Sequence, residues 1–242
     1  MRMKKVIINF MVAAAAVAAI SACSNVEQLR APQAPETTTK RFTVSLDGQT
    51  RTEVTLGATG KVQWVAGDSF SVLDGKSNIK VTLTADNISE DGYKADFEIP
   101  VTQDGYYTAV YPYSEGNALD PENDEYAIAA GVNARQDGSF SSAHIASAYF
   151  LSDDDSFQFH NVVGVLHFTL SNPEVAAIAI KGNNDEQLSG EIRTTAGDDS
   201  AAAEWTGNAP GKTITVAANK SGEYFIGTMG TTFSMGFSSA KP

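Results

Sequence analysis

The chain has 242 residues, 17 of them basic and 29 acidic, with a formal net charge of −12 and one cysteine. This acidity argues against a nucleic-acid-binding protein, because affinity for the phosphate backbone comes mainly from lysine and arginine contacts. The lone cysteine cannot form an internal disulfide, so packing and hydrogen bonds must hold the fold together.

Residues 1–22 are typical of a secretory signal peptide. Basic residues near the start are followed by an uncharged apolar run over residues 6–20. That run is too short for a transmembrane helix, which needs roughly 20 apolar residues. Removal of the signal would leave 14 basic residues against 29 acidic ones, a balance of −15.

The end of this signal, Ile20-Ser21-Ala22-Cys23, resembles the lipobox of bacterial lipoproteins. The resemblance implies cleavage before Cys23 and acylation of its thiol, and each acyl methylene buried in a membrane contributes about 0.8 kcal/mol. The alternative is that Cys23 is only a small residue near an ordinary cleavage site. Residues 23–40 include two prolines and three consecutive threonines, which predicts a flexible tether.

The first predicted strand follows this tether, at residues 41–46. Phe42, Val44 and Leu46 alternate with polar residues, which is the period of a half-buried strand. The strand is expected to end at Gly48. Arg51 then lies in a polar segment that we predict to be an exposed connection accessible to a protease.

The rest of the chain predicts an all-β protein. Short apolar segments are separated by acidic-glycine pairs, which favour turns; these pairs are Asp74-Gly75, Asp91-Gly92 and Asp104-Gly105. We predict two tandem β-sandwiches, residues 41–155 and 156–242. The second has room for only about five or six strands against the usual seven, so it is small, truncated, or completed by a strand from elsewhere.

Two segments near the predicted boundary are less regular. Residues 143–151 are compatible with a short helix or a wide loop. Residues 157–170 form the longest apolar stretch after the signal, and we predict that they make one central strand with both faces partly buried.

Residues suited to catalysis or metal binding are hard to find. His144, His160 and His167 lack the spacing of a zinc site, and we interpret them as structural. Residues 120–125 offer oxygen ligands for Ca²⁺ but lack the glycine of an EF-hand loop, which favours a solvated loop. We therefore predict no catalytic residue, no metal, no cofactor and no enzymatic activity, although a hydrolase with two carboxylates is a further hypothesis.

The aromatic residues allow a different function, glycan binding. Trp64 and Trp205, together with eight tyrosines, could form a platform on which sugars stack. Trp64 lies in an apolar run, however, and we expect it in the core. Tyr106 and Tyr107 are adjacent on a predicted strand, so they should point to opposite faces, with one of them buried.

The order of several short motifs resembles the fimbrillin-like family, lipoproteins of Gram-negative anaerobes that include the type V pilins. The motifs are Thr50-Arg51, Trp64-x-x-Gly67-Asp68, Gly105-Tyr106-Tyr107-x-x-x-Tyr111-Pro112, Phe159-His160-Asn161-x-x-Gly164-x-Leu166-x-Phe168, Ile178-x-Ile180 and Leu188-x-Gly190. With the lipobox, the tether and the first strand, the resemblance covers almost the whole chain, from Cys23 to about Gly236.

This resemblance implies two transthyretin-like, Greek-key sandwiches on a protein anchored by lipid at the surface of the outer membrane or built into a fimbrium. An arginine-specific protease would cut after the first strand, at Arg51 or, less favourably, at Arg41. Removing the strand takes Phe42, Val44 and Leu46 out of a groove, which a strand of another subunit then fills.

The partners implied are other pilin subunits or copies of this chain, the outer membrane through the lipid, and surface glycans or proteins of host or bacterium, but no nucleic acid. Asp199-Ser200-Ala201 also resembles an O-glycosylation site of these bacteria, with Ser200 as acceptor, although such a tripeptide is common by chance. The alternative function is a glycan-binding surface lipoprotein that does not polymerise.

Overall fold

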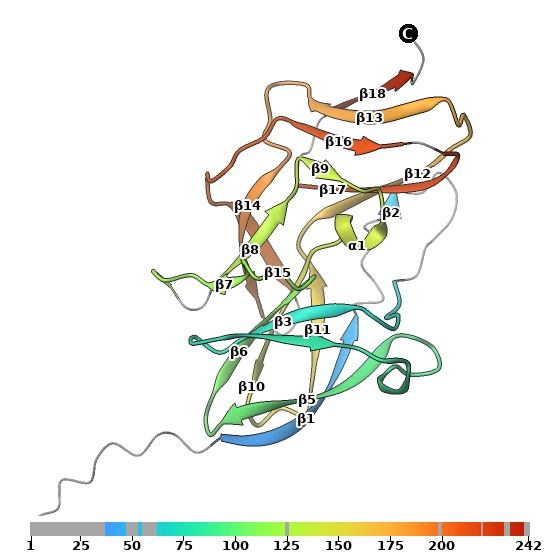
Figure 1. Cartoon of the computed structure of the whole chain (residues 1–242). Coiled ribbons are helices and arrows are strands. Elements are labelled where there is room, and N and C mark those ends of the chain that lie inside the picture. The colour runs from blue at the N-terminus through green and yellow to red at the C-terminus, as the bar shows by residue number, and fades with distance from the viewer. Residues whose placement is uncertain are drawn as a thin grey trace, which may run out of the picture. The chain divides into compact units, whose positions relative to one another are not determined.

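The computed structural model describes residues 37–46, 53–54, 62–123, 126–197, 200–218, 220–229 and 233–239. They are mostly strands (Figure 1), which confirms the all-β class. The elements are β1 (Thr37–Leu46), β2 (Glu53–Val54), β3 (Ser69–Leu73), β4 (Asn78–Thr82), the 3₁₀ helix η1 (Ala85–Asn87), β5 (Lys94–Thr102), β6 (Tyr106–Tyr111), β7 (Ala118–Leu119), β8 (Ala127–Val132), β9 (Arg135–Gln136), α1 (Phe140–Ala143), β10 (Ala146–Leu151), β11 (Ser156–Asn161), β12 (Gly164–Leu170), β13 (Val175–Gly182), β14 (Gly190–Ala196), β15 (Ala201–Trp205), β16 (Thr213–Ala217), β17 (Gly222–Thr228) and β18 (Phe233–Ser239).

The largest sheet has seven strands in the order β4-β3-β6-β10-β11-β1-β5. If it were flat, β3 and β5 would lie roughly 24 Å apart, because neighbouring strands are about 4.8 Å apart. The rings of Phe70 on β3 and Phe97 on β5 are nevertheless 5.2 Å apart, centroid to centroid. The sheet therefore curls until its ends face each other, and it encloses a first hydrophobic cluster rich in aromatic residues.

Three smaller sheets enclose a second hydrophobic cluster. Their strand orders are β17-β12-β2, β18-β13-β16-β9 and β15-β14-β8-β7. The cluster is mostly aliphatic, and Ile178, Ile180, Ile192 and Ile214 in it are fully buried.

Strands β3 and β6 contribute to both clusters. Val72 belongs to the first and its neighbour Leu73 to the second, and the same holds for Ala109 and Val110. Adjacent residues of a strand point to opposite faces, so these strands are buried on both sides. Tyr106 and Tyr107 follow the same rule, since Tyr107 is buried and Tyr106 is exposed, as predicted.

Strand pairing does not divide at the boundary predicted after Asp155. Strand β11, just beyond that boundary, pairs with β10 and β1 in the large sheet, whereas β8, well before it, contributes Ala127 and Ala129 to the second cluster. All described residues belong to one compact unit, Pro35–Pro242. The two-domain division therefore stays a prediction, and the chain crosses between the two clusters several times.

The prediction of one central strand over residues 157–170 is wrong. The stretch forms β11 and β12, which lie in different sheets, with the break at Val162 and Val163. Val163 is buried in the second cluster while Phe159 is buried in the first. The stretch is continuously apolar because the chain leaves one core and enters the other.

Residues 143–151 are neither a helix nor a loop along most of their length. Helix α1 ends at Ala143, and residues 146–151 form β10, which pairs antiparallel with β6.

Among all the residues that the structure describes, no helix is long and apolar enough to cross a membrane.

Candidate functional site

Strand β1 occupies an interior position in the large sheet although it is the first described element of the chain. It pairs antiparallel with β5, from Thr37 opposite Thr102 to Ser45 opposite Lys94. It also pairs parallel with β11, from Thr43 opposite Ser156 onward. Taking β1 away would leave β5 and β11 about 10 Å apart, two strand spacings, with both facing edges unpaired.

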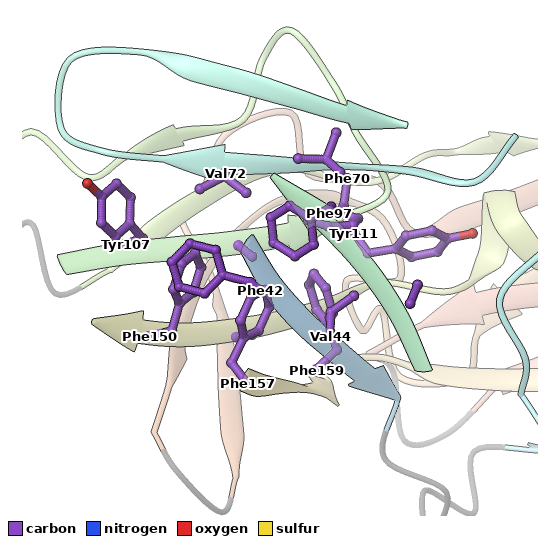
Figure 2. Close-up of a cluster of buried hydrophobic side chains, with 14 of the residues drawn as sticks. Phe42, Val44, Phe70, Val72, Phe97, Tyr107, Tyr111, Phe150, Phe157 and Phe159 are labelled. Carbon is purple, nitrogen blue, oxygen red and sulfur yellow. The ribbon is translucent and has the colours of Figure 1, made fainter. Parts of the chain in front are cut away.

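The inward face of β1 completes the first hydrophobic cluster. Phe42 and Val44 are fully buried, and Leu46 is 8% exposed, in agreement with the alternation seen in the sequence. The ring of Phe42 lies 5.0 Å from that of Phe150 on β10, 5.8 Å from Phe97 on β5 and 6.5 Å from Phe157 on β11. Figure 2 shows these rings gathered around the start of β1, the blue strand. We call the position of β1 between β5 and β11 the β1 slot.

The outward face of β1 is fastened by polar contacts. The guanidinium of Arg41 donates to Asp96 at 2.8 Å, and the Thr43 hydroxyl donates to the same carboxylate at 2.7 Å. The Thr43 hydrogen bond, followed by the one from Arg41, lowers the pKa of Asp96. Lys40 donates to the carbonyl of Ser152 at 3.1 Å. Exposed contacts of this kind contribute little, about 0–1 kcal/mol each, so burial of the apolar face holds the strand.

The two predicted cleavage residues differ in setting. Arg41 lies within the ladder, opposite Glu98 on β5, where hydrogen-bonded backbone resists proteolysis. Arg51, like Cys23, lies outside the described residues. The strands on either side of it belong to different sheets, because β1 ends at Leu46 in the large sheet and β2 begins at Glu53, beside β12.

Strand β18 presents a partly uncovered apolar face. It pairs with β13 at the end of its sheet, with Met235 opposite Ile180 and Phe237 opposite Ile178. Opposed residues of paired strands share a face, yet the two isoleucines are fully buried while Met235 is 37% and Phe237 56% exposed. The apolar side of β18 is therefore less completely covered than the same side of the neighbouring strand β13.

The three histidines occupy separate places. His144 follows α1 and is buried against Asn161, and His160 is buried on β11. His167, on β12, stacks on Phe225, with ring centroids 4.4 Å apart. Within the described ranges there is no group of three or more histidine, cysteine or acidic residues that could hold a metal ion.

The acidic loop at residues 120–125 is exposed at residues 121–123, as predicted, but its first residue is buried. Asp120 is 4% exposed, and its carboxylate lies 2.6 Å from Nε of Arg193 on β14. An ion pair thus occupies the first carboxylate of the proposed Ca²⁺ loop. Charge patterning could not reveal this, because Arg193 is distant in sequence. Asp124 and Glu125 lie outside the described residues.

Neither tryptophan offers a broad exposed face for a sugar. Trp64 is 3% exposed, as expected for a core residue, and Trp205 packs partly buried against the second cluster. Ser200, the predicted glycosylation residue, is exposed between β14 and β15, and its carbonyl accepts a hydrogen bond from Gly197 N–H at 2.8 Å. Asp199 lies outside the described residues.

Sequence reasoning identified β1 but missed the residues that surround it. Phe97 and Phe157 stood out only as members of apolar segments, and Asp96 carried no signal. Alternation at Phe97 and Phe157 indicates that they face a core, but it does not show that they face Phe42.

No family model matches the chain, and no curated protein matches it. One solved structure that aligns with the chain is the crystal structure of a "putative cell adhesion protein" from Bacteroides ovatus. It is 14% identical in sequence, and the alignment covers 85% of this chain and 87% of that one with a TM-score of 0.41. This similarity is distant.

Proposed function

We propose that the protein is a surface lipoprotein of the fimbrillin type, a pilus subunit or adhesin that assembles by β-strand exchange and carries out no catalysis. The observation that carries this proposal is the β1 slot. A strand at the start of the folded chain is interior to a sheet, and its apolar residues Phe42, Val44 and Leu46 fill the core. Lipid on Cys23 anchors the subunit at the outer membrane before assembly.

Cleavage after Arg51 would remove the only covalent link between β1 and the rest of the folded chain. The strand is then held by its backbone ladders to β5 and β11 and by three apolar side chains. Once it leaves, the two unpaired edges and the aromatic-lined slot favour insertion of a new strand. Backbone hydrogen bonds would hold the inserted strand, and alternate apolar residues would set its register.

A second copy of this chain has a strand with the required pattern. In β18, Phe233, Met235 and Phe237 alternate with serine and glycine, as Phe42, Val44 and Leu46 alternate with threonine and serine in β1. Strand β18 also lies at the end of its sheet. Because Met235 would replace the smaller Val44 and Phe237 the smaller Leu46, the slot must adjust when β18 enters.

The test is controlled digestion of residues 24–242 with an arginine-specific protease, followed by intact mass and gel mobility. We expect loss of the segment ending at Arg51, survival of the remaining fold, and ladders of oligomers. Arg51→Lys should abolish both the cut and the ladders. The matched variant Arg41→Lys should behave like the unmodified chain, because β1 protects Arg41 within its ladder.

Two outcomes would contradict the proposal. One is that Arg51→Lys forms the same ladders as the unmodified chain. The other is that the chain cut at Arg51 stays a monomer, whether or not β1 has left it. That result would favour a surface protein that is not assembled by strand exchange.

A further inference from the structure

The first half of β1 carries two positive charges that contact acidic groups on both sides of the β1 slot. Lys40 and Arg41 are the one adjacent pair of basic residues in the sequence after the signal. The guanidinium of Arg41 lies 2.8 Å from the carboxylate of Asp96 on β5, and the Lys40 ammonium lies 3.4 Å from that of Asp155, which directly precedes β11. Each side of the slot therefore supplies one carboxylate to β1.

Lys40 also contacts the aromatic residue of β1. Its ammonium lies 5.3 Å from the centroid of the Phe42 ring, which is within the range of a cation–π contact. The same ammonium donates to the Ser152 carbonyl at 3.1 Å, in the turn between β10 and β11. A basic residue two places before the aromatic residue thus joins the ring in the core to the acidic border of the slot.

Departure of β1 would leave these carboxylates without their cations. Among the described residues, Asp96 is paired with Arg41 and Asp155 with Lys40, and neither carboxylate has another cation within ion-pair distance. Glu98, directly opposite Arg41 on β5, adds a third acidic group on the same face as Asp96. The vacated slot would therefore be bordered by negative charge.

Strand β18 of a second copy matches the apolar pattern of β1 but not its charge. With Phe233 at the position of Phe42, the two residues before it are threonines. Cleavage at Arg51 leaves a chain with 10 basic and 26 acidic residues, a balance of −16, so two cut copies repel each other. Strand β18 brings no cation to the acidic border that would offset this repulsion.

We propose that the β1 slot captures most rapidly a strand with two basic residues directly before its aromatic residue, and that this strand belongs to a different subunit, because this chain has such a pair only in β1. The inference rests on the proposed function and names the partner of its slot. Exposed ion pairs contribute little to final stability, whereas complementary charge raises association rates by about 10- to 1,000-fold. Strand β18 can still fill the slot, but more slowly.

Competition between two labelled peptides measures capture directly. Residues 24–242 are cut at Arg51, the protease is inhibited, and two peptides of residues 37–46 with different dyes are added, one unchanged and one with Lys40→Gln and Arg41→Gln. The early ratio of bound peptides gives the ratio of their capture rates, whatever the rate at which β1 leaves. At about 0.1 M salt, where charges act over roughly 10 Å, we expect the unchanged peptide to be captured at least about fivefold faster. Near about 1 M salt the two rates should become equal.

Matched variants of the cut chain locate the effect. Asp96→Asn with Asp155→Asn removes two charges from the border of the slot, and the ratio of capture rates should fall below about twofold. Glu115→Gln with Glu122→Gln removes two charges at exposed residues between β6 and β8, outside the slot. This second pair should leave the ratio unchanged, because at about 0.1 M salt distant charges are screened.

The strand of a second copy provides a further comparison. A peptide of residues 228–237 has Phe233 at the place that Phe42 has in the β1 peptide. We expect its capture to be at least about fivefold slower than that of the unchanged β1 peptide at about 0.1 M salt. Thr231→Lys with Thr232→Arg in this peptide should remove most of the difference.

Failure of this inference and failure of the proposed function give different results. If neither β1 peptide enters the slot at any salt concentration, strand exchange at this slot is refuted and the inference with it. Equal capture of the charged and uncharged β1 peptides at about 0.1 M salt refutes the inference alone. The same conclusion follows if the preference persists near about 1 M salt or in the Asp96→Asn, Asp155→Asn chain, because these carboxylates are then not its source.

Discussion

Truncation of Phe42 should test whether the inward face of β1 holds the sheet together. The side chain is fully buried and lies within 6.5 Å of three other aromatic rings, centroid to centroid. A buried phenylalanine replaced by alanine costs about 3–5 kcal/mol, and each favourable ring pair adds about 0.5–1.5 kcal/mol beyond area burial. We therefore expect Phe42→Ala to lower the free energy of unfolding by about 4–5 kcal/mol.

The control is the same substitution at Phe237 on β18, whose side chain is 56% exposed. Exposed positions usually change stability by about 0.5 kcal/mol, so Phe237→Ala should be nearly neutral. Urea unfolding followed by fluorescence reports on the right core, because Trp64 belongs to the same cluster as Phe42. A loss below about 1 kcal/mol for Phe42→Ala, or equal losses at the two positions, would refute this account of β1.

Two further predictions concern a buried histidine and a close backbone approach. Burial lowers the pKa of His144 from 6.5 to about 4. As the pH falls below 6.5, the unfolded chain therefore binds a proton on this histidine before the folded chain does. The free energy of unfolding should be greatest above pH 6.5 and should decrease towards pH 4 by at most about 3 kcal/mol. Between pH 4 and pH 6.5, the urea midpoint of His144→Gln should depend less on pH than that of the unmodified chain. An equal pH dependence in the two chains would contradict the role given to His144. Gly131 has φ +88°, and a Cβ there would lie 2.0 Å from the Gly190 carbonyl oxygen, whereas Gly67 has φ +99° and open space around it. In thermal unfolding, Gly131→Ala should lower the free energy of unfolding by more than about 2 kcal/mol and Gly67→Ala by about 1 kcal/mol. Equal decreases would mean that the backbone around Gly131 moves to accommodate the Cβ without cost.

The sequence pattern predicts the inward face of β1 but not its neighbours. The alternation of Phe42, Val44 and Leu46 with polar residues is contained within one short segment, and it directly predicts a strand with one buried face. The partner β11 is far away in sequence, with Thr43 opposite Ser156. Parallel pairing across such a separation depends on the whole topology, and no pattern within either strand specifies it.

Burial on both faces explains the remaining errors. The stretch 157–170 is apolar throughout, which is expected both for one central strand and for two strands that enter different cores. The break at Val162 and Val163 lies just before Gly164, at the point where the chain passes from the first cluster to the second. The ion pair between Asp120 and Arg193 was hidden for a similar reason, since tertiary contact alone determines which acidic residues are buried.

The structure of the β1 slot also indicates where the specificity of an exchanged strand would reside. Backbone hydrogen bonds to β5 and β11 can be made by any extended chain, and the outward contacts of Arg41 and Thr43 with Asp96 are exposed and weak. The position of Phe42 is different, because three aromatic rings surround it and an undersized residue leaves a cavity there. Under the proposed function, a synthetic peptide of residues 37–46 should therefore compete for the vacated slot, and the same peptide with alanine in place of Phe42 should not. Exchange of one strand for another would then be permissive along most of the ladder and selective at this one aromatic position.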